Sequence, residues 1–136
     1  MKIDRVWAVY FTGTQTTSKV VEKLADELAG RLGCDRLTYD FSLPQARTEP
    51  MEFSAGDLVI FGTPVIAGRV PNVLLKYLAD IRGNGALGVP VVLYGNRNYD
   101  DALIELRDIM EAGDIRTIAA GAFIGEHSFS KVLGAG

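Results

Sequence analysis

The sequence has very few residues of the kinds that hold metals or form disulfides. Cys34 is its single cysteine and His127 its single histidine. One cysteine excludes a disulfide within the chain and a metal or iron–sulfur centre ligated by its cysteines. One histidine cannot by itself anchor a zinc ion. Disulfide scaffolds and cysteine-ligated metal centres are therefore removed from consideration.

Long apolar runs and a large excess of one charge are also lacking. No stretch approaches the roughly 18 apolar residues of a membrane-spanning helix. The first residues do not have the layout of a secretory signal. The 14 basic residues are scattered and the formal net charge is −3, which argues against a nucleic-acid or anionic-membrane partner. We expect a cytoplasmic protein whose 136 residues form one domain, 1–136.

Short apolar runs alternate with stretches of helical periodicity along the chain. Apolar residues at helical spacing predict three helices, the last ending at Gly113 as its C-terminal cap. The segment 42–56 carries Pro44 and Pro50 and is expected to be a loop crossover. The runs that predict buried parallel strands are 6–11, 58–61, 89–94 and 117–124, with 36–39 as a weaker candidate. The predicted helices cover residues 21–32, 73–81 and 102–110.

This alternation predicts an α/β domain with a doubly wound, five-stranded parallel sheet in the order 2-1-3-4-5. In such sheets ligands bind beyond the carboxyl ends of the strands, where the strand order reverses. The reversal lies between the first and third predicted strands. The loops that follow Phe11, Phe61 and Tyr94 are therefore expected to form the site.

The first of these loops, residues 12–17 (TGTQTT), lies between a predicted strand and a predicted helix. Its four threonine hydroxyls and the free N–H groups of a helix N-terminus can bind phosphate without a lysine. The triphosphate loop G-x-x-x-x-G-K-[ST] and the dinucleotide fingerprint G-x-G-x-x-G are both absent there. The segment favours one terminal phosphate, and the alternative interpretation is a threonine-rich helix cap.

The other two loops offer groups suited to a planar ligand. In residues 62–71 (GTPVIAGRVP), glycine and proline define the loop, and Gly68 can adopt backbone conformations closed to other residues. Residues 95–99 (GNRNY) place amide and guanidinium groups beside Tyr99, whose ring can stack on a planar ligand. The alternatives are an ordinary turn for the first and helix-start packing of Tyr99 for the second.

These residues, in this order, resemble the flavodoxin superfamily. Thr12, Thr14 and Thr17 match the hydroxyl positions of its phosphate-binding loop. The segments 62–71, 94–99 and 125–128 resemble the flavodoxin-like N-terminal domain of proteins that continue into a ferredoxin-type 4Fe–4S module. The resemblance spans essentially the whole chain and implies bound FMN, with Tyr99 stacked on its isoalloxazine ring. The implied binding residues are Thr12, Gly13, Thr14, Gln15, Thr16, Thr17, Thr63, Pro64, Val65, Ile66, Ala67, Gly68, Gly95, Asn96, Arg97, Asn98 and Tyr99.

The sequence departs from that family at three places. Gln15 stands where glycine is usual, and Ile66 replaces an aromatic residue of the second loop. Little chain remains after the last predicted strand for the usual final helix. A sheet face without that helix would expose apolar residues, which usually marks a partner surface. From this we expect a homodimer, a partner protein, or a chain cut from a longer protein.

The resemblance implies an electron-transfer protein that shuttles electrons between redox partners, such as a ferredoxin-type module or a reductase. FMN would supply the chemistry, so no residue is expected to act as a catalytic acid, base or nucleophile. One alternative is a small FMN-dependent reductase of quinones or other acceptors with a nicotinamide donor, and another is a binding module that has lost the flavin. Remaining residues are interpreted as structural: Trp7 in the core, Cys34 in a turn, Asp100 and Asp101 at a helix start, and His127 as packing or surface, with flavin contact as the alternative for His127.

Overall fold

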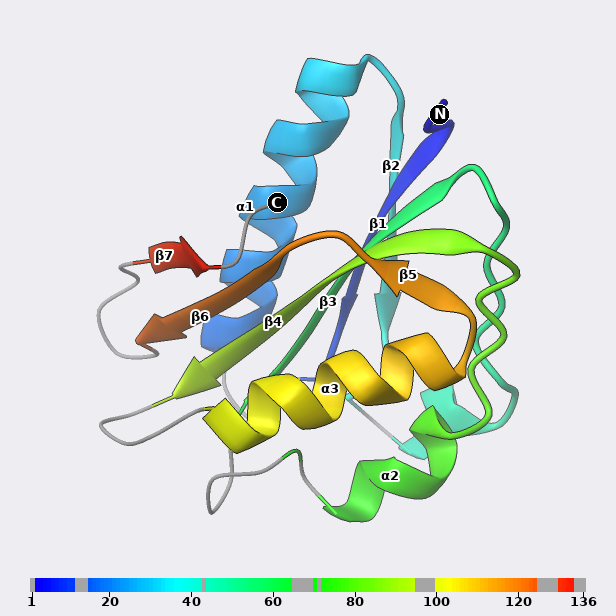
Figure 1. Cartoon of the computed structure of the whole chain (residues 1–136), viewed down its shortest axis with the longest axis vertical. Helices are drawn as coiled ribbons and strands as arrows, with labels where there is room; N and C mark the ends of the chain where they lie inside the picture. Colours follow the sequence, from blue (N-terminus) through cyan, green and yellow to red (C-terminus); the bar gives the residue numbers. More distant parts are fainter. Residues whose placement is uncertain are drawn as a thin grey trace.

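The computed structural model of the protein describes residues 2–11, 15–42, 44–64, 70, 72–94, 100–124 and 130–133. These residues form one sheet with helices on both of its faces (Figure 1). In chain order the elements are β1 (Arg5–Tyr10), α1 (Gln15–Leu32), β2 (Asp35–Asp40), a 3₁₀ turn (Pro44–Arg47), β3 (Asp57–Pro64), α2 (Asn72–Leu78), β4 (Ala86–Tyr94), α3 (Asp100–Ala112), β5 (Ile115–Thr117), β6 (Ala120–Ile124) and β7 (Ser130–Leu133).

The sheet has the order β2-β1-β3-β4-β6-β7, and β5 also pairs with β4. All pairs are parallel except β6 with β7, which is antiparallel. The predicted fifth strand corresponds to β5 and β6 together. The predicted order 2-1-3-4-5 is therefore confirmed, with β7 as an additional strand at the edge.

The single strand predicted over residues 117–124 is wrong in detail, because it is divided into β5 and β6. β5 pairs with the start of β4 and β6 with its end, so neither strand pairs with Val89 or Pro90. Proline has no N–H group to donate to a neighbouring strand. The gap in pairing therefore includes Pro90, the one residue of β4 that cannot donate a hydrogen bond to a neighbouring strand. The strand beside β4 is divided into β5 and β6 at this place.

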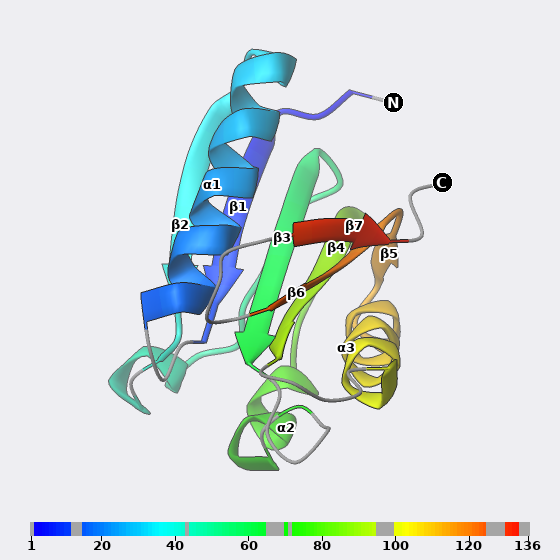
Figure 2. The ribbon, with the colours of Figure 1, turned by 90° about the vertical axis from the view of Figure 1, so that its left-hand side faces the viewer.

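The helices divide between the two faces of the sheet as right-handed connections require. α1 packs through Val21 and Ala25 on a cluster that contains Ala8 and Ile60. α2 and α3 pack on the opposite face in a separate cluster. Figure 2 shows α1 and α3 on opposite sides of the sheet. The carboxyl ends of the strands are thus flanked by helices on both faces.

Two predicted helix ends differ from the structure. α2 ends at Leu78 rather than continuing to Ile81, although Ile81 is still buried. After α3, the left-handed backbone conformation is adopted by Asp114 (φ 67°) and not by Gly113. Gly113 has a different role: a Cβ at that position would lie 3.0 Å from the carbonyl oxygen of Ile81. This glycine is needed for the close approach of two chain segments.

The open apolar face expected near the last strands is not seen among the described residues. On the α1 side, Leu87, Val91 and Leu93 of β4 and Phe123 of β6 have exposed fractions of 8, 0, 4 and 2%. The described residues that follow β6 form the strand β7 rather than a helix. Whether the protein forms a homodimer remains a prediction.

Candidate functional site at the carboxyl ends of β1, β3 and β4

The strand order reverses between β1 and β3, as the sequence predicts. β1 lies between β2 and β3, and the chain passes from β1 to β2 on one side before returning to β3 on the other. β1, β3 and β4 are parallel neighbours and end at Tyr10, Pro64 and Tyr94. The segments that follow these three strands therefore leave the sheet at the same edge. This edge is the position where ligands bind in such folds.

The N-terminus of α1 points at this edge. α1 begins at Gln15, close behind the end of β1, and its first turn contains no acidic residue. Thr17 in this turn is 2% exposed, so the start of the helix is packed against the sheet. Free N–H groups and the helix dipole give such a terminus a positive character, which favours an anion.

Gly62 of β3 holds α1 close to the strands. A Cβ at Gly62 would lie 2.2 Å from Cγ2 of Val21 and 3.3 Å from Cγ2 of Thr17. The carbonyl oxygen of Gly62 accepts a hydrogen bond of 3.1 Å from the N–H of Phe11. The ends of β1 and β3 and the first turns of α1 are thus held together at one glycine.

Thr63, a predicted binding residue, is fully buried, and its Oγ1 donates a hydrogen bond of 3.2 Å to the carbonyl oxygen of Pro64. Alternation along the strand places it on the face of Phe61, where α2 and α3 pack. The Thr63 hydroxyl therefore stabilises the end of β3 in this structure, and Pro64 is half-buried beside it.

An aromatic cluster supports the edge on the α2 side. The ring of Phe41 lies 6.1 Å from that of Phe11, 5.5 Å from that of Phe61 and 5.8 Å from that of Tyr77. The Arg47 guanidinium lies 5.8 Å from the Phe11 ring. No sequence pattern predicts this cluster, because Phe61 comes from β3, Tyr77 from α2, and the other two rings from the residues just after β1 and β2.

A tyrosine on each face has a raised pKa. Tyr10 donates a hydrogen bond of 2.8 Å to Oε2 of Glu22 in α1. Burial, the main cause, and this carboxylate raise the pKa of Tyr10 to about 12. On the other face, burial and a 3.2 Å hydrogen bond to the Tyr39 hydroxyl raise the pKa of Tyr77. Both phenols therefore stay protonated as hydrogen-bond donors at neutral pH.

Most of the predicted binding residues lie outside the described residues. Gln15 and Thr16 are described only as the first residues of α1, and Thr17, Thr63 and Pro64 are placed as given above. The predicted binding roles of all these residues remain predictions. Those outside the described residues are Thr12, Gly13, Thr14, Val65, Ile66, Ala67, Gly68, Gly95, Asn96, Arg97, Asn98 and Tyr99, and His127 lies outside them as well.

Two other kinds of site find no support in the part of the chain that the structure describes. That part contains no group of three or more His, Cys, Asp or Glu side chains suited to a metal ion. None of its helices is long and apolar enough to cross a membrane.

Comparison with known proteins identifies the fold. No family model matches the chain, and no curated protein matches its sequence. A solved structure with a similar fold is the flavodoxin of Streptococcus pneumoniae TIGR4, with a TM-score of 0.65 and 17% sequence identity. The similarity covers 88% of this chain and 83% of that flavodoxin. At this identity the likeness shows the fold alone: the protein has a flavodoxin-like α/β fold.

Proposed function

We propose that the protein binds FMN at the carboxyl ends of β1, β3 and β4 and carries electrons between redox proteins. The observation that carries this proposal is the position of the α1 N-terminus. It lies at the point where the strand order reverses, within the threonine-rich segment 12–17. The likeness to a flavodoxin supports the same interpretation.

The start of α1 fits a phosphate group. Its first turn has no carboxylate to repel an anion, and its N–H groups face the edge of the sheet. Thr12, Gly13 and Thr14 would supply hydroxyl and backbone donors just before the helix, followed by Gln15, Thr16 and Thr17 within it. No lysine is needed, since the oriented N–H groups supply the positive character.

The two neighbouring segments would hold the ring. Residues 63–68 follow β3 and residues 95–99 follow β4, and these strands are adjacent and parallel. Tyr99 would stack on one face of the ring, and the aliphatic Ile66 would lie near the other. When bound, FMN supplies the electron chemistry, and the chain positions the ring and sets its environment. Gly68 would allow a backbone carbonyl to turn toward a ring nitrogen.

The donor and the acceptor would be other redox proteins. One is expected to be a reductase, and another a ferredoxin-type module of the kind found in the two-module proteins that the sequence resembles. No side chain of this chain has to act as an acid, base or nucleophile in that role. A homodimer, one of the three alternatives expected from the sequence, would add a second copy of the same site.

The proposal is tested by comparing FMN with riboflavin, which has the same ring but no phosphate. The protein, stripped of any flavin, is titrated with each ligand while flavin fluorescence and the visible spectrum are recorded. We expect saturable binding of both and tighter binding of FMN. Thr14→Glu places a carboxylate in the proposed phosphate loop and should weaken FMN binding much more than riboflavin binding.

Thr48→Glu is the matched control, because Thr48 is exposed in the loop before β3. It introduces the same charge and should leave both affinities unchanged. Failure of the protein to bind either flavin would refute the proposal. Equal binding of FMN and riboflavin would refute the phosphate site. Steady turnover with NADH or NADPH and a quinone would favour a reductase over an electron carrier.

A further inference from the structure

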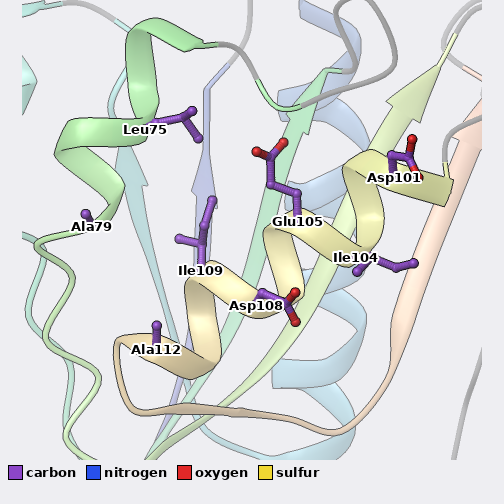
Figure 3. A pocket seen from close by; sticks show the side chains of 8 residues that line it. All are labelled: Leu75, Ala79, Asp101, Ile104, Glu105, Asp108, Ile109 and Ala112. Carbon is purple, nitrogen blue, oxygen red and sulfur yellow. The ribbon is translucent and has the colours of Figure 1, made fainter.

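A surface groove runs between α2 and α3, on the face of the sheet opposite α1 (Figure 3). Its volume is about 780 Å³. Leu75 and Ala79 of α2 and Ile109 and Ala112 of α3 form its apolar part. Leu75 and Ile109 are half-buried and pack against the core beneath, so the bottom of the groove is fixed by the fold.

The groove also exposes an apolar side chain. Ile104 of α3 lines it and is 48% exposed, one of three large apolar side chains exposed among the described residues. In Figure 3 it extends from α3 on the side away from α2. Ile104 and Ile109 are about 140° apart around α3, so Ile104 lies at the far rim of the groove and is separated from its apolar floor by the polar side chains between them.

One side of the groove is acidic. Asp101, Glu105 and Asp108 line it, and their spacing of four and three residues places them along one face of α3 (Figure 3). Among the described residues, none that lines the groove is basic. Asp108 pairs with Arg107 at 3.1 Å, but both side chains are at least half exposed, so this pair neutralises the surface only weakly.

Two of these acidic residues have structural roles: Asp101 lies in the first turn of α3, where the helix dipole favours a carboxylate, and Oε1 of Glu105 accepts a 3.0 Å hydrogen bond from the N–H of Val70. The helix (DDALIELRDIMEA) has five acidic residues and one arginine, and its last turn has no basic residue. Asp108 and Glu111 therefore lie toward the negative end of the helix dipole, where carboxylates are unfavourable. Asp101 with Glu105, and Glu105 with Asp108, are like-charge neighbours on one face. Helix stability therefore does not explain Asp108, an exposed carboxylate toward the C-terminal end of α3, and this residue favours a role in binding for the acidic side of the groove.

We propose that this groove binds a basic amphipathic helix of a partner protein. α3 has 13 residues and is about 20 Å long, which matches three to four turns of a partner helix. Lysine or arginine side chains at intervals of three and four residues would face the three carboxylates. An apolar stripe on the same helix would cover Leu75 and Ile109. The groove lies outside the proposed flavin-binding segments, so this proposal and the proposed function can fail separately.

The probe is a designed, fluorescein-labelled helical peptide of about five turns, with one leucine stripe flanked by lysines. A second peptide has the same residues in scrambled order. Fluorescence anisotropy with the full chain should show saturable binding of the ordered peptide, about tenfold tighter than that of the scrambled one. The double variant Asp101→Lys/Asp108→Lys should weaken binding of the ordered peptide at least about tenfold.

Glu27→Lys is the matched control, because Glu27 is exposed on α1, on the opposite face of the sheet. This variant should change the affinity less than about twofold. The single variant Asp108→Lys distinguishes binding from folding: it should weaken binding while its Tm stays the same or rises, since a cation is favoured near this end of α3. Absence of saturable binding, equal binding of both peptides, or equal weakening by Glu27→Lys would overturn the proposal.

Discussion

Replacing Gly62 by alanine tests how closely α1 is held to the sheet. The added methyl group would lie 2.2 Å from Cγ2 of Val21, whereas ordinary carbon–carbon contacts are about 3.5–4.0 Å. Val21 is β-branched, and in a helix it has essentially one favourable rotamer, so it cannot turn away at low cost. α1 must move outward by more than about 1 Å, and overpacking of this kind typically costs about 1–3 kcal/mol.

The cost should depend on Val21. Val21→Ala alone removes two buried methyl groups and should lower the free energy of unfolding by roughly 2 kcal/mol. In the double variant Gly62→Ala/Val21→Ala the new methyl group fills part of the space left by Val21. The double variant should therefore lose about 1–2 kcal/mol less than the sum of the two single variants. Urea unfolding followed by circular dichroism measures all four proteins.

A second glycine supplies the matched control. Gly30 lies in α1, and nothing is within 4 Å of the position of its Cβ. Gly30→Ala should therefore raise the free energy of unfolding by about 0.5–1 kcal/mol through helix propensity alone. If Gly62→Ala is as stable as the unmodified protein, or if the effects of Gly62→Ala and Val21→Ala add fully, the close packing at the candidate site is refuted.

Three further predictions test the described contacts. Asp57 is 1% exposed, and its Oδ1 accepts a 2.8 Å hydrogen bond from Nε of Arg5. Arg5→Ala should therefore lower the free energy of unfolding, measured in urea, by about 3 kcal/mol, and Asp57→Asn should lower it less. Equal losses would contradict a buried charge at Asp57. The pKa of Tyr10 is raised to about 12, so its contribution to stability is complete below pH 10 and is lost between pH 10 and 12; Tyr10→Phe should flatten the pH dependence of unfolding in that window. Asp114 and Asn84 both have a positive φ, of 67° and 53°. Asp114 is exposed, so Asp114→Gly should relieve the unfavourable backbone conformation and raise Tm. The Asn84 side chain donates a 2.7 Å hydrogen bond to a backbone carbonyl, so Asn84→Gly should lower Tm.

The strand order could be predicted from the sequence because its signals are local. Each buried parallel strand is a short apolar run, and the alternation with helical periodicity leaves few possible topologies. The position of the candidate site follows from that order, because parallel strands bring their following loops to one edge. Neither the strand order nor the position of the candidate site depends on knowledge of side-chain contacts.

The details that were wrong or missed depend on contacts between distant segments. The break between β5 and β6 lies opposite Pro90, a residue that looks like part of an ordinary apolar run in the sequence. The sequence favours Gly113 as a helix cap, but its close neighbour in the structure is Ile81, about thirty residues earlier in the chain. The rings around Phe41 come together only after the sheet has formed, so no spacing in the sequence reveals them.

The central claim is that a flavin binds where β1, β3 and β4 end, and amide NMR of the isotope-labelled protein tests it most directly. Spectra are recorded as FMN is added to the flavin-free protein. We predict that the largest shift changes occur in residues 12–17, 63–68 and 95–99, with smaller changes further along α1. Unchanged spectra, or changes gathered at the opposite ends of the strands near Lys2 and Cys34, would contradict the account.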